Sequence, residues 1–183
     1  EIIFNDFYEW IIFTLDFFTE NKIKISIKPH PNSYTIHREN IRLIEKLKKK
    51  YSHFIWLDSN TPNKEIFKKI KLAISPWGSV LWELAYFKIP CISIGENPGK
   101  QYKFSFIPKT INEYKYLLEN YKKLKSTVKK KSIYEFVYVY MINNNDAFSN
   151  IARKIDLRSI NLNVSSGLKI FIKRLKKYKI NYE

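Results

Sequence analysis

Two short segments carry residue types that can bind a phosphate group. One is the Pro-flanked turn Lys28–Pro31, and the other is the Gly/Ser-containing segment Ser75–Glu83. An imidazole held in a stiff turn can donate a hydrogen bond to a phosphate oxygen. A Gly-Ser turn that opens a helix offers unpaired backbone N–H groups to the same anion. The candidate binding residues are therefore His30, Ser75, Gly78, Ser79 and Glu83.

Glu83 adds a second kind of contact. It follows Ser79 by four residues, so both side chains lie on one face of the predicted helix. A carboxylate one turn inside that helix can reach a ribose hydroxyl. Lys28 adds positive charge if its side chain faces the same way, and Trp77 can stack on a base or sugar, whereas Trp82 is expected in the core.

Each of these residues also has an ordinary structural explanation. Gly-Ser is a common turn and helix cap, with Ser79 as the capping residue. His30 can simply pack on its own turn, and Glu83 can be an exposed residue that the helix dipole favours. The argument for a site therefore depends on the elements that bring the two segments together.

Apolar periodicity predicts strands that alternate with helices from Asp6 to Gly95. This order predicts an α/β fold: a Rossmann-like parallel sheet with helices on both faces. Both segments then follow strands and lie at the carboxyl edge, where open α/β sheets bind ligands. The predicted strands are 23–27, 53–57, 71–75 and 90–94, and the predicted helices are 7–18, 37–51, 63 to about 70, and one that opens near Ser79.

The pattern becomes mainly helical after Gly95. We expect a helix over 111–125 with Tyr114 and Leu118 inward. The apolar segment 134–142 is expected to be a helix, and its Val and Tyr content leaves a strand as the alternative. The run 143–146 is a break or cap, and a basic amphipathic segment begins at Ser165. The sequence thus predicts a Rossmann-like nucleotide-binding domain over 1–128 and a helical C-terminal extension over 129–183. The basic tail suits an anionic membrane surface, or packing against another part of the protein.

The net charge of +16 over 183 residues has two interpretations. It is either a solvated Lys-rich surface of the kind an AT-rich genome produces, or a sign of an anionic partner. Cys91 is the only cysteine, which excludes a disulfide framework and favours a reduced, cytoplasmic setting. No signal peptide or membrane-spanning run is recognisable. Because the chain begins with Glu1 rather than Met, we expect a fragment of a longer protein.

These segments resemble the C-terminal, donor-binding half of bacterial GT-B glycosyltransferases of the capsular polysaccharide biosynthesis type. Lys28–Pro31 matches the His-Pro motif of that family. Ser75–Ala85, followed by Lys88–Pro90, matches its Ser/Thr motif, and the resemblance covers roughly Asp6 to Gly95.

The resemblance implies roles for the candidate residues. His30 and Ser79 would contact the donor phosphate, Glu83 the ribose or sugar, and Ser75 and Gly78 would line the same pocket. It implies a glycosyltransferase that needs neither metal nor cofactor, whose catalytic base lies in an N-terminal half outside this sequence. The fragment would then be inactive alone.

The implied partners are a nucleotide-sugar donor and a polysaccharide or lipid-linked glycan acceptor, at the cytoplasmic face of the membrane. Two alternatives keep the fold and change the reaction: a polyol-phosphate transferase and a sugar-nucleotide epimerase. A third is a non-enzymatic, basic nucleic-acid-binding module. It is not favoured, because no RNP, zinc or helix-turn-helix signature is recognisable.

Overall fold

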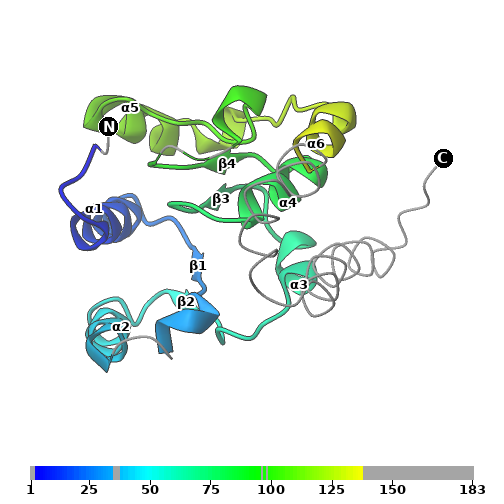
Figure 1. Cartoon of the computed structure of the whole chain (residues 1–183). Coiled ribbons are helices and arrows are strands. Elements are labelled where there is room, and N and C mark those ends of the chain that lie inside the picture. Colours follow the sequence, from blue (N-terminus) through cyan, green and yellow to red (C-terminus); the bar gives the residue numbers. More distant parts are fainter. Residues whose placement is uncertain (1–2, 35–37, 96, 98, 138–183) are drawn as a thin grey trace, which may run out of the picture.

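Helices alternate with short parallel strands in this chain (Figure 1). The computed structural model describes residues 3–34, 38–95, 97 and 99–137. The element order from α1 to β4 is the predicted one, and the chain has a mixed α/β architecture. The helices are α1 (Phe7–Glu20), α2 (Arg38–Lys50), α3 (Asn63–Phe67), α4 (Val80–Tyr86), α5 (Ile111–Glu119) and α6 (Lys130–Val137). The strands are β1 (Ser26–Ile27), β2 (Ile55–Trp56), β3 (Ala73–Ile74) and β4 (Cys91–Ile92).

The strands form two parallel pairs, β1 with β2 and β3 with β4. Phe106 extends the second pair, because its N–H donates to the Cys91 carbonyl at 2.8 Å and its carbonyl accepts from the Ser93 N–H at 2.9 Å. Parallel pairing of strands joined through helices confirms the predicted α/β class. A single Rossmann-like sheet that joins the two pairs stays a prediction.

The strands are shorter than the sequence predicts, and β1 and β2 begin late because neighbouring turns use their backbone groups. The Ile23 N–H closes the end of α1 by donating to the Phe18 carbonyl at 2.9 Å, so β1 begins later than the predicted residue 23. The Phe54 N–H donates to the Tyr51 carbonyl at 3.2 Å, so β2 begins at Ile55. Predictions of five-residue strands were therefore wrong in length.

Helices cover both faces of the β3–β4 pair. Ala73 and Cys91 belong to a core cluster with α3 and α4 side chains such as Phe67, Leu81 and Leu84. Their neighbours Ile74 and Ile92 belong to a second cluster with α1, α2 and α5. Since successive strand residues point to opposite faces, this partition places α3 and α4 on one face and α1 and α5 on the other. The β1 and β2 side chains Ile27 and Trp56 join the second cluster.

A ring of hydrogen bonds fastens α5 to α1. The Trp10 Nε1–H donates to the Tyr114 hydroxyl at 2.9 Å, and the Thr14 hydroxyl donates to the Trp10 carbonyl at 2.7 Å. The Tyr114 and Thr14 hydroxyls lie 2.8 Å apart. Tyr114 and Leu118 are buried, so the prediction that they face inward is confirmed. Thr14 of α1 is buried beside Tyr114, whereas Phe7, at the start of α1, is 62 % exposed.

Two helices end earlier than the sequence predicts. The helix predicted over 111–125 ends at Glu119, where Asn120 caps it, and the one predicted to reach about residue 70 ends at Phe67. The residues 134–137 are helical as predicted, within α6, whose Phe136 packs against Trp82 with ring centroids 5.1 Å apart. The predictions for 138–142, for 143–146 and for the basic tail lie outside the described residues. Across the described part of the chain, no helix has the length and apolarity to cross a bilayer.

Candidate functional site

The turn between β3 and α4 is shaped by its own side chains. The Ser75 hydroxyl donates to the Trp77 carbonyl at 3.1 Å, and the buried Ser93 hydroxyl donates to the Pro76 carbonyl at 3.0 Å. Gly78 has φ +117°, a conformation that side-chain-bearing residues rarely adopt. Ser75 and Gly78 thus both belong to this turn, and the Ser75 hydroxyl proton is committed to it. Trp77 is 61 % exposed beside it.

Ser79 and Glu83 are brought together as predicted. The Ser79 hydroxyl donates to Glu83 Oε1 at 3.3 Å. Ser79 is the N-cap residue of α4, but its side chain makes no capping hydrogen bond, because its dihedrals are helical, φ −61° and ψ −24°. A capping side chain needs an extended N-cap residue to reach the next backbone N–H groups.

Two further residues continue this contact toward β1. Asn63, the first residue of α3, donates from Nδ2 to Glu83 Oε2 at 3.2 Å. Its Oδ1 accepts from Lys28 Nζ at 2.9 Å. Burial lowers the pKa of Lys28 below its ordinary value, and the Glu83 carboxylate opposes this shift. Lys28, Asn63, Glu83 and Ser79 therefore form one polar chain.

This polar chain joins segments that follow three successive strands. Lys28 comes directly after β1, Asn63 opens the helix after β2, and Ser79 and Glu83 belong to the turn and helix after β3. The carboxyl ends of parallel strands are where α/β proteins gather ligand-binding groups. Sequence reasoning missed Asn63, whose only signal was its position at a helix start after the second strand.

His30 lies two residues beyond Lys28 and is exposed. Its carbonyl accepts from the Ser33 N–H at 2.9 Å, which begins a 3₁₀ turn over Pro31–Tyr34. The Pro-flanked turn is thus folded back on itself as predicted, with Pro29 buried and His30 at the surface. Lys28, two residues earlier, is the residue of this segment that is hydrogen-bonded to Asn63 and through it linked to Glu83.

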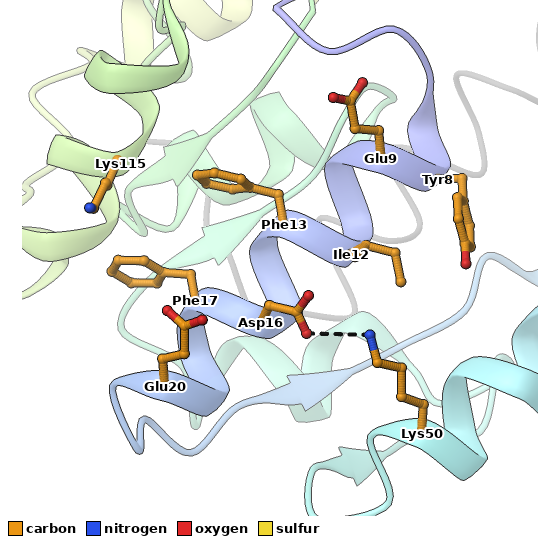
Figure 2. Close-up of a pocket in the computed structure, with 9 residues that line it drawn as sticks. All are labelled: Tyr8, Glu9, Ile12, Phe13, Asp16, Phe17, Glu20, Lys50 and Lys115. Atoms are coloured by element: carbon orange, nitrogen blue, oxygen red, sulfur yellow. Dashed lines mark ion pairs between the residues drawn. The ribbon is translucent and has the colours of Figure 1, made fainter.

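A separate groove of about 570 Å³ lies along α1 (Figure 2) and contains none of the predicted site residues. Two of its carboxylates have structural partners. Asp16 accepts from the Tyr51 hydroxyl at 2.7 Å and pairs with Lys50 at 3.5 Å. Glu9 accepts from the Asn5 N–H at 2.7 Å near the start of α1. The groove is lined by Tyr8, Glu9, Ile12, Phe13, Asp16, Phe17, Glu20, Lys50 and Lys115.

The single cysteine does not supply a nucleophile at neutral pH. Cys91 is fully buried in β4, and burial raises the pKa of its thiol from 9.0 to about 12. A thiol that is protonated and shielded reacts poorly. Among the described residues, no three His, Cys, Asp or Glu side chains are grouped so that they could hold a metal ion.

Comparisons of the chain with models of protein families, with curated proteins and with solved structures find no match. The interpretation of the site therefore depends on its geometry and on the sequence resemblance.

Proposed function

We propose that this chain is the donor-binding half of a metal-independent glycosyltransferase of GT-B architecture. It would transfer a sugar from a nucleotide-activated donor to a surface polysaccharide or its lipid-linked precursor, at the cytoplasmic face of the membrane. In this proposal the two strand pairs belong to one Rossmann-like sheet. One observation carries the proposal: the polar chain from Lys28 through Asn63 to Glu83 and Ser79 joins the segments after β1, β2 and β3.

Such a site has to position the donor and stabilise its leaving phosphate. As the bond between sugar and phosphate breaks, negative charge grows on the leaving phosphate, and donors fixed around it lower the barrier. His30 and Ser79 supply those donors in the proposal. The Ser79 hydroxyl exchanges its 3.3 Å bond to Glu83 for a bond to a phosphate oxygen. Glu83 Oε1 is then released to accept from a sugar or ribose hydroxyl.

A nucleotide titration tests this proposal. We expect the chain to bind at least one of CMP, UMP, UDP and GDP, measured by calorimetry. We further expect His30→Ala and Ser79→Ala to weaken that binding about tenfold or more each, since a hydrogen bond to a charged group contributes roughly 1.5–3 kcal/mol.

The controls are His53→Ala and Ser52→Ala, which remove the same side chains from exposed positions outside the site. They should leave affinity unchanged. Binding of none of the four nucleotides, or equal affinity in all five proteins, would defeat the proposal.

Product analysis then separates the reaction classes. Incubation of the full-length protein that contains this chain with CMP-, UDP- and GDP-sugars and a glycan acceptor should release a nucleoside monophosphate or diphosphate together with an extended glycan. An epimerised nucleotide sugar, or transfer of a polyol phosphate, would instead support one of the two alternative reactions on this fold.

A further inference from the structure

Asn63 separates two opposite charges within the polar chain. Its Oδ1 accepts from Lys28 Nζ at 2.9 Å, and its Nδ2 donates to Glu83 Oε2 at 3.2 Å. The amide can take only this orientation, because an ammonium group only donates and a carboxylate only accepts. Lys28 and Glu83 are therefore linked without a direct ion pair.

Lys28 and Glu83, at the two ends of this Asn63 link, each have hydrogen-bonding positions left for a ligand. The bond to Asn63 uses one of the three N–H donors of the Lys28 ammonium. The Glu83 carboxylate accepts one bond from Asn63 and one from Ser79, and it has about four lone-pair positions. One end can thus bind an anionic oxygen, and the other can accept from a hydroxyl.

The separation also solves an electrostatic problem. A carboxylate beside a phosphate repels it, so Glu83 alone would weaken an anion site. A Lys28 paired directly with Glu83 would have its donors turned toward that carboxylate. With Asn63 between them, the positive group lies on the β1 side, next to the turn that carries His30.

We propose that Lys28 binds the phosphate of the donor and that Asn63 is a positioning residue, which holds Lys28 and Glu83 apart so that the site accepts a phosphate and a hydroxyl of the same nucleotide. This inference rests on the proposed function and extends it by giving separate roles to Lys28 and Asn63. The ligand class is a sugar phosphate unit that carries both groups, as in a nucleoside phosphate.

The Lys28→Met variant tests the proposal that Lys28 binds the phosphate. Lys69→Met is the matched control, because Lys69 is an exposed lysine just after α3. Calorimetric titration with the tightest-binding nucleotide among CMP, UMP, UDP and GDP should show at least a tenfold loss for Lys28→Met. The control should change less than twofold.

A comparison of single and double variants tests the positioning role of Asn63. We expect Asn63→Leu to weaken binding at least threefold in the natural chain and to cause no further loss when Lys28→Met is already present. A merely structural Asn63 would weaken binding in both backgrounds. If Asn63→Leu does not fold, as judged by its melting curve, Asn63→Asp replaces it with the same expectation, because the new carboxylate would pair with Lys28.

The outcomes separate the two proposals. If the natural chain binds none of the nucleotides, both are overturned. If His30→Ala and Ser79→Ala weaken binding but Lys28→Met stays within twofold of the natural chain, only this inference is overturned. Additive losses from Lys28→Met and Asn63→Leu would overturn the positioning role.

Discussion

Gly78 allows the turn between β3 and α4 to take its shape. Its φ of +117° is open to glycine and strained for other residues. A Cβ atom built there meets nothing within 4 Å, so space does not forbid a side chain. The requirement is one of backbone conformation alone, and the turn places Ser79 one residue later.

Gly78→Ala should therefore destabilise the chain by about 1 kcal/mol, the net of a positive-φ strain of roughly 1–2 kcal/mol and a smaller unfolded-state entropy gain. Urea unfolding measures the change. The matched control is Gly95→Ala, whose added Cβ would lie at an ordinary 3.6 Å from the Pro76 carbonyl and where φ is not positive. A Gly78→Ala protein as stable as the Gly95→Ala protein would contradict this account of the turn.

Sequence could predict some of the site residues and not others. The four-residue spacing of Ser79 and Glu83 is enough to place both on one helix face, and they are in contact. Asn63 follows Lys28 by 35 residues, and their hydrogen bond depends on how α3 packs. Local spacing carries no information about such a contact, because it arises only from tertiary packing.

At the scale of elements, the helices begin where local sequence says they should. The Asp6 side chain accepts from the Glu9 N–H, and the Thr110 side chain accepts from the Glu113 N–H. Their ends are less predictable. α1 is followed by Lys22 at φ 54°, a left-handed position that glycine usually occupies. Because Lys22 and not glycine occupies this position, the sequence carries no glycine signal for the end of α1. The turn at Lys22 also delays the start of β1.

Lys22→Gly should stabilise the chain by about 0.5–1 kcal/mol, because it relieves a left-handed strain of roughly 1–2 kcal/mol and adds a glycine entropy cost of roughly 0.5–1 kcal/mol. The control is Lys24→Gly, an exposed residue without a positive φ, which should be destabilising. Thermal and urea unfolding of both variants check the sign. A stability loss in Lys22→Gly would show that the strain at the end of α1 has been misjudged.

At the scale of the molecule, the fold brings side chains from the segments after β1, β2 and β3 into one hydrogen-bonded chain. Period-two alternation along β3 and β4 sends Cys91 toward α4 and Ile92 toward α1 and α5, which fixes which way the strands face. The sequence predicts this layering, because alternation and helix periodicity are local patterns. It does not predict that β1–β2 and β3–β4 form separate pairs, since pairing depends on contacts distant in sequence.

The central claim is that the Pro-flanked turn and the Gly-Ser turn bind one nucleotide together. The most direct measurement is a nuclear magnetic resonance titration of the isotope-labelled chain with CMP and with UDP. We expect the backbone amides of Lys28 and His30, those of Trp77 to Ser79, and the side-chain amide of Asn63 to shift along a single saturation curve. Shifts confined to one of the two turns, or absent from both, would contradict the claim.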